Sequence, residues 1–217
     1  GPGARLLRGG PLTVVTAVAE SDGAGGSYTV SYRYWNGRVS RIGRGFLGFG
    51  MVRSTDSRQA ALHGVAAHTD TAYRQDFPLV GAVDLTETKR ADGSRVHGRD
   101  LTWTPLARPT AADPAGRSHF VALTREVTTE YETDDSGGAG ALVRRSDRTL
   151  TWDLNHGIAT RYVVATTSPD DPLTHTTTTQ RTPDEAARAG AGCLGLVTRE
   201  DVTEATSAGD SATRTAS

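Results

Sequence analysis

The stretch from Tyr28 to Gly50, YTVSYRYWNGRVSRIGRGFLGFG, constrains the fold more than any other part of the chain. Apolar and polar side chains alternate at its start, and the apolar positions are Tyr28, Val30, Tyr32 and Tyr34. Because successive side chains of a strand point to opposite faces, this alternation predicts a β-strand with one aromatic face and one polar face. Asn36-Gly37 then predicts a tight hairpin turn, since both residues tolerate positive φ. We expect a second strand through Val39 and Ile42 to return along the first.

The rest of the chain repeats this strand-and-turn pattern. Threonine is the commonest residue and glycine is frequent, a composition that suits sheets with many turns. Turn signals recur at Asp22–Gly26, Ala91–Ser94 and residues 134–140, and almost no stretch has helical periodicity. The segments expected to be strands are Pro11–Ala19, Thr69–Arg74, Val83–Arg90, Arg95–Trp103, residues 119–132, Leu142–Leu154, Thr160–Thr167, His175–Arg181 and Val197–Ala205. The chain is therefore predicted to be all-β, with antiparallel strands and hairpins.

At most one short helix is expected, near residues 183–190. Thr182 is its predicted N-cap, Pro183 its first helical residue and Gly190 its end. Prolines and polar residues at 106–118 indicate a linker-like segment. It separates a first β-rich section (1–105) from a second one (119–206), and residues 207–217 read as a loose tail.

Charge and composition exclude several classes of partner. The net charge is −1 and the 24 basic residues form no block, so nucleic acid is not an expected partner. The chain has no apolar stretch long enough to predict a transmembrane helix. Its only cysteine, Cys193, excludes an intrachain disulfide and a cysteine-based zinc site. The first residues lack the apolar core of a signal peptide, so we interpret the chain as a piece of a longer protein whose export signal lies elsewhere.

No motif predicts catalysis, cofactor binding or metal binding. Gly43 to Gly48 matches G-x-G-x-x-G, but the residues after it are not helix-forming, as a dinucleotide site requires. Acidic pairs such as Asp134-Asp135 and Asp170-Asp171 lie beside glycine or proline and read as solvated turns. The aromatic stripe that includes Tyr32 and Trp35 could stack on sugars, but such a stripe more often covers a core or a neighbouring sheet.

Two motifs resemble a known family. They are Tyr32-x-Tyr34 followed by Arg44-Gly45-Phe46-Leu47-Gly48-Phe49, and then Gln75-Asp76-Phe77-Pro78. This pattern resembles that of the Rhs/YD-repeat shell proteins and of the B component of insecticidal Tc toxins, including the plasmid virulence protein B relatives. Cys193-Leu194-Gly195 resembles a further element of these proteins, so the resemblance extends over residues 28–206.

The resemblance implies a section of the β-sheet shell that precedes the YD repeats in an exported protein and encloses a C-terminal toxin. The partners implied are the other shell and YD-repeat segments of the same polypeptide and the toxin cargo. The chain itself carries no evident YD repeat or toxin domain, so it would be a non-enzymatic wall segment. Arg44, Phe46, Phe49, Phe77 and Pro78 would then hold the fold, with the rings buried. Two alternatives remain open: a carbohydrate- or surface-binding β-sandwich of a secreted protein, and, third, a β-rich glycosidase.

Overall fold

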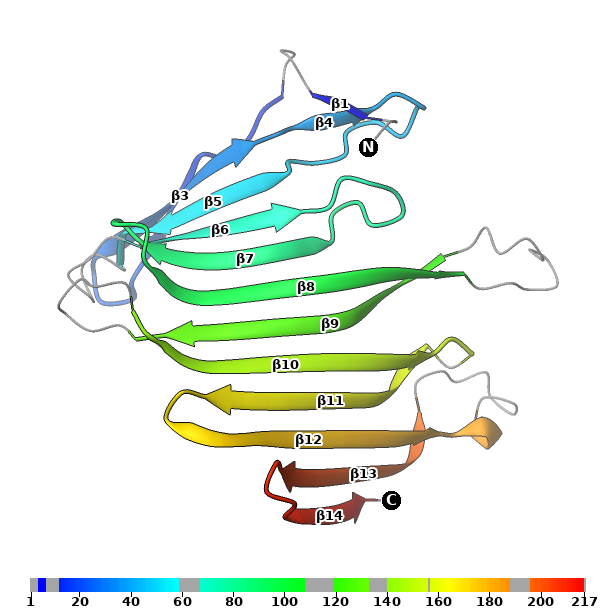
Figure 1. Cartoon of the computed structure of the whole chain (residues 1–217). Helices are drawn as coiled ribbons and strands as arrows, with labels where there is room; N and C mark the ends of the chain where they lie inside the picture. The colour runs from blue at the N-terminus through cyan, green and yellow to red at the C-terminus, as the bar shows by residue number, and fades with distance from the viewer. Residues whose placement is uncertain are drawn as a thin grey trace. The chain divides into compact units, whose positions relative to one another are not determined.

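The computed structural model describes residues 4–6, 12–58, 67–107, 119–132, 140–155, 157–187 and 196–216. Antiparallel strands dominate these residues, which confirms the all-β prediction (Figure 1). Their bounds are β1 (Ala4–Leu6), β2 (Ala17–Ser21), β3 (Ser27–Trp35), β4 (Arg38–Ser40), β5 (Met51–Asp56), β6 (Ala67–Tyr73), β7 (Val83–Arg90), β8 (Arg95–Ala107), β9 (His119–Tyr131), β10 (Leu142–Asp153), β11 (Ile158–Ser168), β12 (Asp171–Pro183), β13 (Val197–Thr206) and β14 (Ser211–Ala216).

Nearly all strands pair with their neighbours in sequence. The hydrogen-bonded order of the large sheet is β14-β13-β12-β11-β10-β9-β8-β7-β6-β5-β3-β2, while β1 and β4 form a separate two-stranded sheet. Contacts divide the chain into unit 1 (residues 1–100 and 131–141) and unit 2 (residues 101–130 and 142–217). The linker predicted at residues 106–118 does not coincide with the boundary between these units. Its residues 106 and 107 are the end of β8, and residues 108–118 lie outside the described residues.

Two predicted turns form as the sequence indicates. Asp22 closes the β2–β3 turn, where its Oδ1 accepts hydrogen bonds from the amides of Ala24 and Gly26 at 2.8 and 2.9 Å. In the β7–β8 hairpin, Gly93 has a φ of 88° and the amide of Ser94 donates to Asp92 Oδ1 at 2.8 Å. Glycine and aspartate at these positions therefore set the strand connections by local chemistry.

The predicted hairpin between β3 and the strand after Asn36-Gly37 is wrong. The alternation in β3 is confirmed, and Asn36 has the expected positive φ of 56°. However, β3 pairs with β2 and β5, and β4 pairs with β1. The chain leaves the large sheet after Trp35 and rejoins it at Met51, so the turn opens an excursion instead of a two-strand hairpin.

The chain ends and the helix also differ from expectation. Strand β2 begins only at Ala17, and residues 12–16 are irregular. The tail is not loose, because Ser211–Ala216 pairs with β13 over its whole length. At the predicted helix, β12 continues through Pro183, and only residues 185–187 are helical in the described part. The amide of Ala187 donates to Asp184 Oδ1 at 2.8 Å, so Asp184 is the N-cap, not Thr182. Gly190, the predicted helix end, lies outside the described residues.

Very little apolar side chain is buried. In the part of the chain that the structure describes, the buried hydrophobic residues are Leu47, Leu79, Leu101 and Ala122. Three polar residues are also buried, namely Glu87, Arg90 and Thr179. Ladder hydrogen bonds and cross-strand polar pairs must therefore supply much of the stability of these strands. No helix within the described ranges is long and apolar enough to cross a membrane.

Candidate functional site

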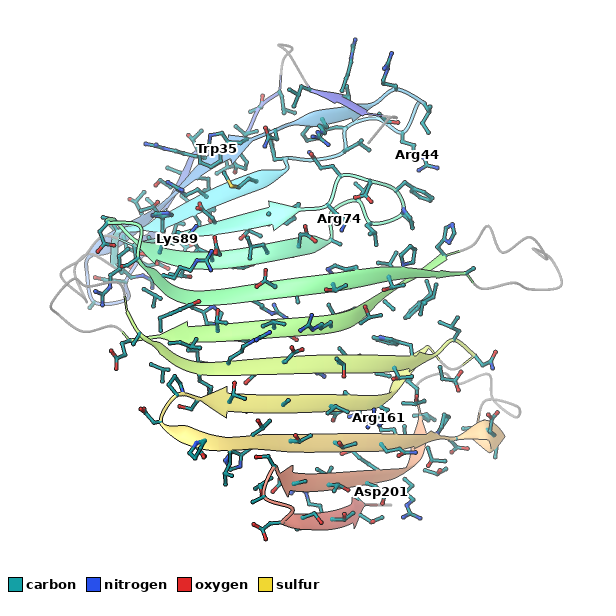
Figure 2. The ribbon with its side chains drawn as sticks, in the orientation of Figure 1. Trp35, Arg44, Arg74, Lys89, Arg161 and Asp201 are labelled. Carbon is teal, nitrogen blue, oxygen red and sulfur yellow. The ribbon has the colours of Figure 1, made fainter. Side chains whose placement is uncertain are left out.

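The two sequence motifs meet on one side of unit 1. Tyr32 and Tyr34 lie in β3, residues 44–49 lie in the excursion between β4 and β5, and residues 75–78 lie in the loop between β6 and β7. Figure 2 shows Arg44 and Arg74 projecting from these two loops on the same side of unit 1. We call this region, residues 36–50 with residues 74–82, the motif loops.

The excursion folds back on itself as a small hairpin. The amide of Arg38 donates to the carbonyl of Gly48 at 3.1 Å, and the amide of Leu47 donates to the carbonyl of Arg38 at 2.8 Å. Near the tip, the amide of Ser40 donates to the carbonyl of Gly45 at 2.8 Å. Gly45 and Gly48 have φ values of 76° and 84°, a region that side chains with a Cβ rarely adopt. The two glycines of the motif therefore have a backbone role.

A row of aromatic rings connects β3 to the excursion. Tyr32 and Tyr34 stack with ring centroids 6.5 Å apart, and Tyr34 lies 4.7 Å from Phe49. Phe46 meets Phe49 edge to face at 5.3 Å. The Phe49 ring also covers Gly37, where an added Cβ would lie 3.2 Å from the ring. The rings thus hold the excursion against β3 through offset and edge-to-face contacts, the geometries that aromatic pairs prefer.

Gln75 joins the two motif loops. Its Nε2 donates to the carbonyls of Asn36 and Gly48, at 2.8 Å each. Its side chain fills the space above Gly50, where an added Cβ would lie 3.0 Å from Gln75 Oε1. One amide group therefore satisfies two carbonyls of a loop that lies 27 or more residues earlier in the sequence.

Asp76 closes the second loop. Arg74 donates two hydrogen bonds to its carboxylate, both at 3.0 Å, and these hold the pKa of Asp76 below its usual value. The amide of Leu79 donates to the carbonyl of Asp76 at 2.8 Å. Phe77 and Pro78 follow with a cis peptide bond between them. This loop is thus held by an ion pair at its base and by the buried side chain of Leu79.

The expectation that the motif phenylalanines are buried is wrong for two of them. Phe46 is 42% exposed and Phe77 is 58% exposed, whereas Leu47 and Leu79 are only 8% and 5% exposed. Each ring has a neighbour but keeps a large accessible surface: Phe46 meets Phe49 edge to face, and the guanidinium of Arg44 lies 3.5 Å from the Phe77 ring centroid. Leu47 and Leu79 supply the buried apolar side chains of the motif loops instead.

Sequence reasoning missed the buried leucines of the motif loops. In the R-G-F-L-G-F order, leucine and phenylalanine are both strongly hydrophobic, so composition gives no signal that Leu47 is the buried one. Gly45 and Gly48 are the local signal in the sequence, because glycine permits the positive φ that changes the direction of the side chains that follow.

The other face of unit 1 carries a row of paired charges. Arg53 on β5 binds Asp70 on β6 through two hydrogen bonds of 2.6 and 2.8 Å. On β7, the buried Glu87 accepts ion pairs from Lys89 at 2.6 Å and Arg95 at 2.7 Å. Asp70 and Glu87 are cross-strand partners in the β6–β7 ladder, and each carboxylate is neutralised by cations on its own or a neighbouring strand.

Two groups in this row have shifted pKa values. The hydrogen bonds from Arg53 lower the pKa of the Asp70 carboxyl. Burial lowers the pKa of His68, helped by the positive charge of Arg53, although Asp70 lies 3.7 Å away and acts in the opposite sense. His68 is therefore held in its neutral form by its surroundings.

The aromatic row borders a groove of about 570 Å³. Leu12, Val14 and Thr16 line one side, and β3 with Phe49 lines the other. The Tyr34 hydroxyl donates to the carbonyl of Val15 at 2.7 Å, so the segment before β2 is fixed to the row. Within the described residues, no three histidine, cysteine or acidic side chains are grouped as a metal site would require.

Comparisons with known proteins agree with the motifs. Residues 10–81 match the family model described as the insecticide toxin TcdB middle/N-terminal region. The fold is similar to a part of the crystal structure of TcdB2-TccC3-Cdc42, with a TM-score of 0.63, 11% sequence identity and 83% of this chain covered. A crystal structure of TcdB2-TccC3 aligns with a TM-score of 0.60 and 13% identity over the same share of this chain. No curated protein sequence matches the chain.

The resemblance to the Tc-toxin B component is thereby confirmed. The chain spans about 12% of the length of the structures that it matches. The motif residues from Tyr32 to Pro78 fall inside the stretch that the family model covers. The third motif, Cys193-Leu194-Gly195, lies outside the described residues, and the likeness to Rhs and YD-repeat proteins stays a prediction.

Proposed function

We propose that this chain is a structural wall segment of a Tc-toxin-like shell and has no catalytic role. The observation that carries the proposal is a 12-stranded antiparallel sheet in a chain whose described residues include only four buried hydrophobic side chains, two of them in the sheet itself. A self-contained domain of this length would bury a large apolar core. Strands with two largely accessible faces suit a wall that divides two compartments.

The ends of the sheet support the same function. Strands β2 and β14 each have one sequence neighbour and one side without a partner among the described strands. Unpaired edges promote association, and proteins that persist as monomers usually cover or shorten them. In the proposed shell, further strands of the same polypeptide continue the sheet at these edges.

The cargo and location follow as parts of the same proposal. The shell would be exported, and it would enclose a toxin domain at the C-terminal end of the assembly, as the family resemblance implies. The Rhs and YD-repeat segments would supply the remaining wall. The motif loops would act as a clamp that fixes the excursion after β3, with Gln75 as the connecting residue.

Sugar binding is the second candidate function. The groove beside Tyr32 favours it, because exposed aromatic faces can stack on sugar rings. However, Tyr32 and Trp35 are half-buried, and the Tyr34 ring packs on Phe49 while its hydroxyl is bonded to Val15. These contacts engage the faces and polar groups that a sugar would use, so we favour the wall.

A protease-protection assay tests the proposal. The polypeptide that contains this chain and its downstream segments would be compared with a variant that lacks residues 196–216, which include β13 and β14. We expect the downstream toxin domain to resist protease in the intact protein and to be cleaved in the variant. Equal cleavage in both would refute enclosure by this wall.

The isolated chain provides a second test. Because its edges and apolar faces are uncovered, we expect it to self-associate in analytical ultracentrifugation at micromolar concentration. A monomer that unfolds in one sharp transition would contradict a wall segment. Measurable binding of soluble glycans by that monomer would favour the second function.

A further inference from the structure

Most arginines of the described chain are paired with carboxylates, but one group near the N-terminus is not. Ion pairs to Asp or Glu are made by Arg53, Arg58, Arg74, Arg95, Arg125, Arg144, Arg145, Arg148, Arg181 and Arg199. The arginines without a carboxylate partner among the described residues are Arg5, Arg33, Arg38, Arg41 and Arg44 in unit 1 and Arg161 and Arg214 in unit 2. The sequence favours this for Arg33, Arg38, Arg41 and Arg44, since no acidic residue occurs between Asp22 and Asp56.

Four of the unpaired arginines belong to the β1–β4 sheet and its hairpin. Arg5 is on β1, Arg38 is on β4, and Arg41 and Arg44 flank the hairpin tip. Figure 1 places β1 and β4 side by side, and Figure 2 shows Arg44 projecting from the tip. We call these four residues, with Ile42, Phe46 and Phe77, the arginine–aromatic patch.

The patch also exposes large apolar side chains. Ile42 at the hairpin tip is 70% exposed, and Phe46 and Phe77 are the exposed phenylalanines of the motifs. Arg44 stacks on Phe77, which holds its guanidinium in a fixed plane while leaving its N–H groups available. Arginine and aromatic residues of this kind are enriched where proteins bind other proteins.

We propose that this patch binds an acidic polypeptide segment in extended form. Each guanidinium can donate two hydrogen bonds to one carboxylate, and the exposed apolar side chains of the patch suit aliphatic residues of the same segment. Strand β4 lies between β1 and Phe46, because Val39 pairs with Arg5 on one side and with Phe46 on the other. The segment would therefore lie across this small sheet instead of extending it at the edge of β1.

The placement of the charges favours a polypeptide over a membrane surface. Arg5 is opposite Val39 and Leu6 is opposite Arg38, so Arg5 and Arg38 belong to adjacent pairs and face opposite sides of the small sheet. A flat lipid headgroup layer can reach one of these sides at a time. A flexible chain that lies across one side of the small sheet and passes around its margin can reach both.

Fluorescence anisotropy with a labelled 12-residue peptide of alternating Glu and Val tests the proposal. The 217-residue chain should bind it, and binding should weaken several-fold from 50 to 300 mM NaCl, as screening of charge pairs requires. The triple variant Arg38→Gln, Arg41→Gln, Arg44→Gln should bind at least tenfold more weakly. The matched control is Arg161→Gln with Arg214→Gln, since these arginines also have no carboxylate partner among the described residues but lie in unit 2.

Three further measurements separate the outcomes. Circular dichroism melts check that the triple variant folds. If the triple variant does not fold, the single variant Arg41→Gln at the exposed tip takes its place, and its affinity for the peptide should fall several-fold. A peptide with Gln in place of Glu should bind poorly. The proposal is overturned if the acidic peptide does not bind, if the patch and control variants bind equally, or if vesicles containing phosphatidylserine bind in preference to the peptide.

Discussion

Replacing Gln75 should loosen the motif loops more than any other single polar substitution in unit 1. In Gln75→Ala, the carbonyls of Asn36 and Gly48 each lose a hydrogen bond of 2.8 Å. One hydrogen bond contributes about 0.5–1.5 kcal/mol net, so the two together predict a loss of about 1–3 kcal/mol. The loss should be local first, because both carbonyls belong to the excursion between β3 and β5.

The substitution Gln75→Glu separates hydrogen bonding from packing. The new carboxylate has the same shape but no donor, and it would face two carbonyl oxygens. We therefore expect it to be worse than Gln75→Ala at pH 7. Repulsion by the carbonyls raises the folded-state pKa of this carboxyl, so the deficit relative to wild type should shrink as the pH falls through that raised pKa.

Urea unfolding followed by tryptophan fluorescence, together with hydrogen exchange of residues 36–50, measures both effects. Gln180→Ala is the control, because Gln180 is exposed on β12 and its side chain has no hydrogen bond to any described residue. The reasoning is refuted if Gln75→Ala matches this control in both measurements. It is also refuted if Gln75→Glu is as stable as wild type at pH 7.

Three other substitutions test the packing and titration of unit 1. Phe46→Ala should lower the free energy of unfolding in urea by about 2 kcal/mol, half the cost of a buried ring, and Leu47→Ala should lower it by about 2–5 kcal/mol. A larger loss for Phe46→Ala than for Leu47→Ala would contradict the observed burial. Gly48→Ala should cost about 1–2 kcal/mol because its φ is 84°, and unchanged stability would show that the loop adopts another conformation. Because the pKa of His68 is lowered in the folded state, the unfolded chain binds more protons than the folded chain once the pH falls below about 6.5. The free energy of unfolding should therefore decrease from pH 7 to 5, and His68→Gln should make this decrease smaller. A slope that His68→Gln leaves unchanged would place the titrating group elsewhere.

The sequence predicts the strands whose signals are local. Alternation in β3 and the Asp92-Gly93 turn between β7 and β8 depend on neighbouring residues only, and both are confirmed. Strand β14 was missed because Ser211–Ala216 contains no large apolar side chain. Its pairing with β13 is what makes it a strand, and single-sequence patterns do not contain that information.

The helix start and the motif loops show two further limits. Thr182 and Asp184 are both acceptable N-caps, and the choice depends on how far β12 pairs with β13, which the pairing of Pro183 with Val197 decides. For the motif loops, the family resemblance identified the residues but not their roles. The hydrogen bonds from Gln75 to two carbonyls distant in sequence have no counterpart in local periodicity. Phe46 is exposed although its hydrophobic side chain predicts burial.

Charge pairs across strands explain how sheets with so little buried apolar surface keep one register. In unit 2, the Tyr162 ring lies between Arg148 and Arg181, at 5.0 and 5.3 Å, and Glu200 binds Arg181 at 2.6 Å. Arg53 and Asp70 make an equivalent connection in unit 1. A slip of one residue would move every such side chain to the opposite face and break these pairs together. Individually each exposed pair contributes little, but the penalty for a wrong register is the sum over all of them. A sheet can therefore leave both faces accessible and still specify its register, because cross-strand polar pairs do what a buried core does elsewhere.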